Sequence, residues 1–141
     1  MKVTIGYGSA RRIIRRGPGN TAPIVLSAKE VGAGPTAILI SVQSGGRSRS
    51  YILFTPTAAR LGEIAPESPR ATYAGASAKK VLSDLAALTG LVILAEKPLD
   101  KTFVGEMSPG TPVSALEGVS ADLGLKVQPQ GKAIYLLTAA Q

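Results

Sequence analysis

Two copies of one short pattern, 34 residues apart, constrain the fold of this chain more than any other feature. In each copy an N-capping hydroxyl precedes a helical stripe of leucine and valine, which ends at a glycine followed at once by an apolar run. A left-handed glycine reverses the chain, so the next residues can return as a strand over the helix's apolar stripe. The pattern predicts helices over 78–89 and 112–123, each followed by a strand. The matched pairs are Ser77 with Thr111, Leu82 with Leu116, Leu85 with Val119, Gly90 with Gly124, Leu91 with Leu125, and Ile93 with Val127.

A period of 34 residues also occurs in helical-hairpin solenoids, but those need two helices per repeat and at least three repeats. Each unit here holds one helix and one or two strands. Further strands are predicted at 91–95, 102–107, 125–128 and 133–137. Residues 70–141 are therefore expected to form a β-α-β-β-α-β-β domain with both helices on one face of small sheets.

The N-terminal part of the chain has the composition of strands and turns. The runs at 36–43 and 48–55 flank the sequence SGGR, and a Gly-Gly pair suits the tight turn of a hairpin. Shorter runs at 2–7, 12–16 and 23–28 are separated by the turn sequences GPGNT and GAGP. We expect a β-rich domain over 1–66, a small sandwich or barrel, and a boundary in the sequence APESP. The chain as a whole is then a two-part α+β protein.

Charge divides the chain at the same place. Residues 1–70 carry ten Lys and Arg against three Asp and Glu, whereas residues 71–141 carry six of each, so the net charge of +7 lies in the N-terminal half. The densest run is RRIIRR, with Arg11, Arg12, Arg15 and Arg16. On a strand these side chains alternate between the two faces.

Two interpretations of the arginine run stay open. The arginines are candidates for binding the phosphates of DNA or another anion, because guanidinium groups pair with phosphate oxygens. Alternatively, they belong to a solvated edge strand whose charges prevent aggregation. The edge-strand interpretation is favoured because only Tyr7 and Tyr51 could offer base stacking nearby.

No motif in the chain indicates catalysis, and we expect no enzyme, no cofactor and no metal. The chain has neither histidine nor cysteine, which removes the commonest acid-base group and the thiolate ligand. SAKK matches Ser-x-x-Lys, but its partner motifs are absent, and Ser77 is explained as an N-cap. The acids Glu96, Asp100 and Glu106 are too few, and too close to Lys97 and Lys101, to indicate a metal site.

Residues 72–138 resemble the secretin and TonB short N-terminal domain. The resemblance lies in the segments VLSDLAALTGLVIL, VGEMSPGTPVSALEGVSADLGLKV and QGKAIYLLT, taken in that order and spacing. The capping pattern itself predicts structural roles for four residues, as N-caps for Ser77 and Thr111 and as helix ends for Gly90 and Gly124. Among members of the family, the secretins of type IV pilus machines fit best, because they place β-rich domains before this module.

The resemblance implies a structural and interactive function. Such modules form homo-oligomeric rings at the periplasmic mouth of an outer-membrane channel and dock inner-membrane or pilus-assembly proteins, in machines that also take up DNA. It implies that the full-length protein lies at the periplasmic face of the outer membrane and is held there by a channel domain that lies outside this chain. Since no signal peptide follows Met1, we expect a fragment of a longer exported precursor. The alternatives are a signalling module of a TonB-dependent receptor or its regulator, and a small Arg-rich nucleic-acid-binding protein.

Overall fold

The fold is mixed α and β, with more strand than helix. A computed structural model describes residues 2–7, 10–17, 36–56, 64–67, 70–97, 99–107, 109–131 and 133–139. The strand predicted at 23–28 lies outside the described residues. The strands are β1 Lys2–Tyr7, β2 Ala10–Arg15, β3 Thr36–Ser44, β4 Arg47–Thr55, β5 Thr72–Ser77, β6 Val92–Glu96, β7 Thr102–Glu106, β8 Leu125–Gly131 and β9 Ile134–Ala139. The helices are α2 Ala78–Thr89 and α3 Pro112–Asp122.

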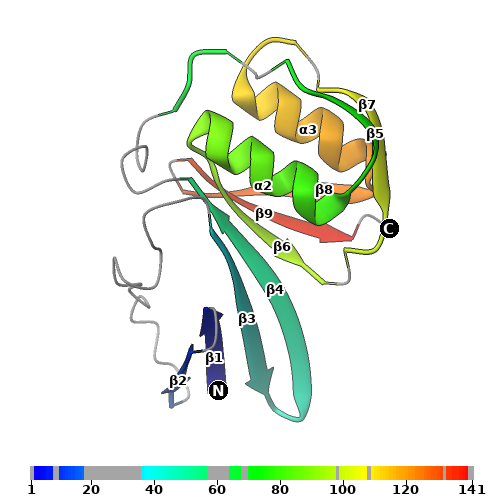
Figure 1. The fold of residues 1–141 in the computed structure, drawn as a ribbon. Coiled ribbons are helices and arrows are strands. Elements are labelled where there is room, and N and C mark those ends of the chain that lie inside the picture. The colour runs from blue at the N-terminus through cyan, green and yellow to red at the C-terminus, as the bar shows by residue number, and fades with distance from the viewer. Residues whose placement is uncertain are drawn as a thin grey trace.

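Seven of the strands form one sheet in the order β2-β1-β3-β4-β6-β9-β8, and β5 and β7 form a second, two-stranded sheet (Figure 1). Neighbours in the large sheet are antiparallel except β6 and β9, which are parallel. The predicted hairpin is present as β3 and β4, and its turn is Gly45-Gly46 with φ angles of 57° and 79°. Positive φ at both central residues matches the right-handed twist of the flanking strands.

The described N-terminal strands do not close into the sandwich or barrel that the sequence predicts. β1 to β4 lie side by side as an open part of the large sheet, and β4 continues it by pairing Phe54 with Ile93 of β6. The physical reason lies in β4, where Ile52, Leu53 and Phe54 are all buried. A strand that is apolar on both faces is stable in the interior of a sheet, with a neighbour on each side. One sheet thus spans the boundary predicted near residue 66.

The residues of β4 divide between two apolar cores. Ile52 and Phe54 join the core that α2 and α3 form against the large sheet, whereas Leu53 joins Val3, Ile5 and Ile38 in the second core. The helices lie over one half of the large sheet, and the β3–β4 hairpin extends beyond them (Figure 1). Helix α2 contacts β4 and β6 of the large sheet and also β5 and β7 of the small sheet, so this helix has strands on two sides rather than on one.

Each helix begins and ends at the residues that the repeated pattern marks. The side-chain oxygens of Ser77 and Thr111 accept hydrogen bonds from the N–H groups of Lys80 and Ser114, both at 3.2 Å. Gly90 has φ 84° and its N–H donates to Ala86 O at 3.0 Å, so it ends α2 in the left-handed conformation. In α3 the C-cap is Leu123, and Gly124 takes the left-handed conformation just after it.

Candidate functional site

A basic hollow lies at the end of the large sheet, beside the β3–β4 turn. Its volume is about 580 Å³. Strand pairing brings the cations together, because Lys2 lies opposite both Arg15 of β2 and Gln43 of β3. The lining residues are Lys2, Arg15, Arg16, Gln43, Ser44, Gly45, Gly46, Arg47 and Ser48. The described lining holds four positive side chains and no acid, which makes this hollow attractive to anions.

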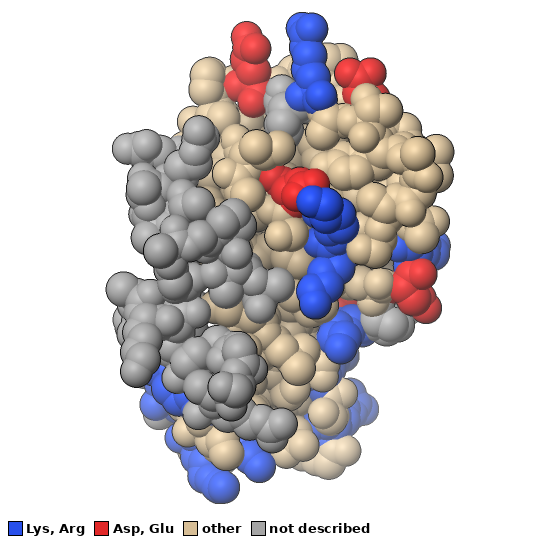
Figure 2. All heavy atoms as spheres, in the orientation of Figure 1, with Lys and Arg blue, Asp and Glu red and all other residues tan. Residues whose placement is uncertain are grey.

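A second groove, of about 250 Å³, is lined by Val42, Ser44, Arg47, Arg49 and Tyr51 and shares Ser44 and Arg47 with the hollow. Arginines therefore surround the β3–β4 turn, and Figure 2 shows Lys and Arg gathered at this end of the molecule. The described residues of β1 to β4 include no Asp or Glu. Within the described part of these four strands, the cations thus outnumber the carboxylates and give this end a positive potential.

The structure brings together only part of the predicted arginine cluster. Arg15 is exposed and Arg16 half-buried, and both line the hollow. Arg12 is half-buried and lies opposite Ile5, outside the residues that line the hollow. The backbone of Arg11 lies opposite Gly6 in the strand register, and the structure does not describe the Arg11 side chain.

Sequence reasoning missed Lys2 and Arg47 as members of the basic surface. The sequence shows both residues as cations, but neither belongs to the RRIIRR run. Their place depends on β1 pairing with β2 on one side and β3 on the other, with the turn at Gly45-Gly46 bringing Arg47 back beside Ser44. Pairing between distant strands leaves no local signal in the sequence.

Strand β2, which carries the arginine run, is at one edge of the large sheet. The opposite edge is β8, whose pairing with β9 is irregular between Pro129 and Gly131. Charges and proline both discourage an edge strand from pairing with further chains. This position agrees with the edge-strand interpretation of the run, and it leaves anion binding at Arg15 and Arg16 equally compatible.

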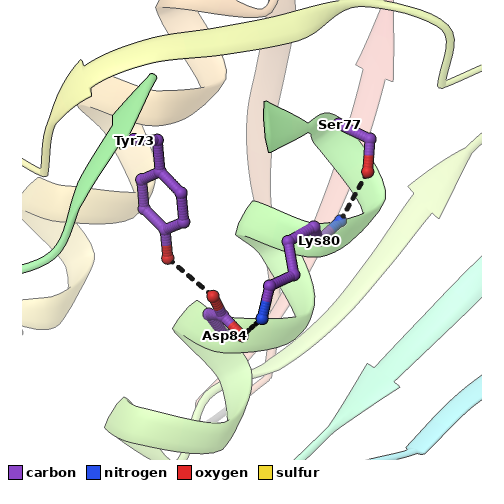
Figure 3. Close-up of polar contacts among 4 residues, drawn as sticks. All are labelled: Tyr73, Ser77, Lys80 and Asp84. Carbon is purple, nitrogen blue, oxygen red and sulfur yellow. Dashed lines mark hydrogen bonds and ion pairs between the residues drawn. The ribbon is translucent and has the colours of Figure 1, made fainter. Parts of the chain in front are cut away.

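A polar network joins the small sheet to helix α2 (Figure 3). The hydroxyl of Tyr73 donates to Asp84 Oδ2 at 2.8 Å, and Lys80 Nζ pairs with Asp84 Oδ1 at 3.0 Å. Lys80 thus points at Asp84 while Ser77 Oγ is occupied by the Lys80 N–H. The Ser-x-x-Lys pair therefore serves the start of the helix rather than forming a nucleophile-base arrangement. Burial, with the hydrogen bond and the charge of Asp84, raises the pKa of Tyr73 well above its ordinary value.

Tyr73→Phe is expected to change how stability depends on pH. The pKa of Tyr73 is higher in the folded chain than in the unfolded chain, where it is about 10. The protonated hydroxyl therefore contributes its full stabilisation below about pH 10, and this contribution is lost as the pH rises further. Urea unfolding should therefore show the parent chain losing its advantage over Tyr73→Phe as the pH rises from about 10 to about 12. Parallel stability curves for the two proteins across that range would contradict the role given to the Tyr73 hydroxyl.

The described part of the chain offers no group of three or more Asp and Glu placed to hold a metal ion. No helix among the described residues has the length and apolar character needed to cross a membrane. Comparisons with protein-family models, with curated proteins and with solved structures give no match.

Proposed function

We propose that this chain is a ring-forming or partner-docking module of an outer-membrane secretin, at the periplasmic face of that membrane. The observation that carries the proposal is the doubled helix-glycine-strand unit. It stands in the order β5-α2-β6-β7-α3-β8-β9, the order expected from the resemblance to the secretin and TonB short N-terminal domain. The type IV pilus class is the branch proposed, because β-rich segments precede the doubled unit.

The surface of the module is suited to assembly. Val104 on the small sheet is 70% exposed. Exposed apolar side chains favour packing between proteins, and a heterologous interface between identical copies forms a ring when the rotation between the copies closes. The partners proposed are identical copies and inner-membrane or pilus-assembly proteins.

The test is an immunoblot of fractionated source cells with an antibody raised against this chain. We expect a band in the outer-membrane fraction that runs as a very large multimer and resists heat and detergent. That behaviour is expected of a secretin ring held by extensive interfaces between its copies.

Other outcomes separate the alternatives. A large outer-membrane band that becomes monomeric in detergent would overturn the ring and favour a TonB-dependent receptor. A single soluble band near 14.4 kDa would overturn both and favour the small nucleic-acid-binding protein.

A further inference from the structure

A groove of about 400 Å³ lies between helix α3 and strands β8 and β9. Leu125 and Val127 alternate along β8, so they share the face of the strand that packs against the core beneath the helices. Glu117 of α3 is exposed beside them. The described lining is thus apolar or aromatic apart from one carboxylate. Its residues are Val113, Glu117, Leu125, Val127, Pro129 and Tyr135.

The carboxylate of Glu117 meets no cation along its own helix. Side chains three and four positions apart are neighbours on a helix, and those flanking Glu117 are uncharged. They are Val113, Ser114, Ser120 and Ala121. Lys126 of β8 stands between Leu125 and Val127, so strand alternation directs it to the other face of the sheet. A cation from outside can therefore approach Glu117.

The chemistry of the groove matches an arginine side chain. The aliphatic stem of an arginine can lie along Leu125 and Val127 while its guanidinium group pairs with the carboxylate of Glu117. The ring of Tyr135 offers a face on which a guanidinium group can stack. An anion would be repelled by Glu117, and a wholly apolar side chain would desolvate that carboxylate without pairing it.

The turn between β3 and β4 presents such an arginine. Arg47 is exposed directly after Gly45-Gly46, and Ser44 and Ser48 beside it are small. A side chain added at either glycine would meet no described residue within 4 Å, so the turn stands clear of its surroundings. The described residues of β1 to β4 include no carboxylate that could pair with Arg47.

The turn and the groove lie at opposite ends of the molecule (Figure 1). Arg47 therefore cannot enter the groove of its own chain, and a contact between them joins two copies. Figure 2 shows the same polarity, with Lys and Arg gathered at the turn end and the visible Asp and Glu nearer the helices. A contact between unlike surfaces of identical copies is heterologous, the kind that builds rings when its rotation closes.

We propose that the groove between α3 and β8 binds Arg47 of a second copy of this chain. The stem of Arg47 lies along Leu125 and Val127, and its guanidinium group pairs with Glu117. The inference rests on the ring-forming role proposed above, for which it names the contact between neighbouring copies.

The experiment uses the absence of cysteine from the chain, because one introduced cysteine then marks one position. The turn chain carries Ser44→Cys, opposite Arg47 in the strand register. The groove chain carries Ala121→Cys, exposed one helical turn after Glu117. The two chains, with tags of different size, are mixed and treated with a bismaleimide, and the heterodimer is measured on a denaturing gel. The control chain carries Ala74→Cys, exposed on β5.

We expect at least about fivefold more heterodimer with the groove chain than with the control chain. Arg47→Glu in the turn chain should lower the yield by about tenfold or more, because two carboxylates then meet. Lys79→Glu, an equal charge change at an exposed position of α2, should leave the yield unchanged. Should the turn chain with Arg47→Glu not fold, as judged by circular dichroism, Arg47→Ala replaces it with an expected loss of about threefold.

A charge exchange tests whether the two residues meet. Glu117→Arg in the groove chain should lower the yield by about tenfold, whereas Glu106→Arg, an equal change on β7, should not. Glu117→Arg combined with Arg47→Glu in the turn chain should restore at least about half of the parent yield. One substitution offsets the other in this way when the two side chains interact directly.

Several results would overturn the proposal. Equal yields with the control chain would show random collision, and an equal loss with Lys79→Glu would show a general charge effect. Failure of the charge exchange to restore the yield would separate Arg47 from Glu117. Absence of the heterodimer, with binding of a labelled peptide of core Val-Arg-Val that Glu117→Arg abolishes, would assign the groove to a different protein.

Failure of this contact is distinguishable from failure of the ring. Cross-linking is measured on the purified chain, whereas the immunoblot reports the assembly in cells. A missing heterodimer with a very large outer-membrane band would overturn the Arg47 contact and place the ring interface elsewhere. A specific heterodimer with a single soluble band near 14.4 kDa would support the contact and overturn the secretin ring.

Discussion

Phe54→Ala is expected to lower the free energy of unfolding of the chain by about 3–5 kcal/mol. Phe54 is fully buried and is among the largest side chains in the core beneath α2 and α3. It reaches that core from β4, in the N-terminal half, where it lies opposite Ile93 of β6. The cavity left by alanine would open between β4 and the helices, and such a loss is large against the 5–15 kcal/mol typical of a domain.

The measurement is thermal unfolding followed by the helical circular-dichroism signal. The two described helices both lie beyond residue 77, so among the described residues this signal reports the C-terminal half. Leu39→Ala, on the neighbouring strand β3, is the matched control, because Leu39 is largely exposed and should change stability by less than about 1 kcal/mol. An unchanged helical transition in Phe54→Ala would contradict the shared core and support two independently folding domains.

The helix ends and the hairpin turn could be predicted from the sequence because the residues that determine them are neighbours in the chain. Helix α2 spans 78–89 as expected, since Ser77 Oγ accepts a hydrogen bond from the N–H of Lys80 and Gly90 provides the left-handed end. The strand register at Gly45-Gly46 is likewise set by the turn itself. Each of these features depends on residues only a few positions apart.

The arrangement of the sheet could not be predicted in the same way. Joining β4 to β6 and β6 to β9 requires pairing of segments about 40 residues apart or more, and no short motif specifies such partners. One signal was available in β4, where Ile52, Leu53 and Phe54 are consecutive apolar residues. An uninterrupted apolar run is typical of a strand buried on both faces, hence of an interior strand.

The basic surface shows the same limit. The sequence shows RRIIRR as a charge cluster, yet of its arginine side chains that the structure describes, Arg15 and Arg16 line the hollow and Arg12 does not. Lys2 and Arg47 join them through strand pairing. Charge composition therefore predicts that a basic surface exists, while strand register decides which cations share it.

Gly90→Val is expected to destabilise the chain by about 1–3 kcal/mol, and Gly124→Val by a similar or smaller amount. Gly90 is buried and holds φ 84°, and its N–H donates to Ala86 O. Gly124 holds φ 71°, and a side-chain carbon there would come within 2.6 Å of Lys101 Nζ, a flexible end that can move aside. A β-branched residue is strained in this conformation at both positions, but only at Gly90 must it also fit into a buried site.

Gly90→Asn is the matched control, because asparagine adopts the left-handed conformation more readily than valine does. Thermal midpoints should fall in the order parent, Gly90→Asn, Gly90→Val. Equal losses for asparagine and valine would assign the effect to crowding rather than to backbone conformation. Unchanged midpoints for both valine variants would contradict the repeated helix-glycine-strand unit, since the chain reversal at each glycine is what returns the strand over its helix.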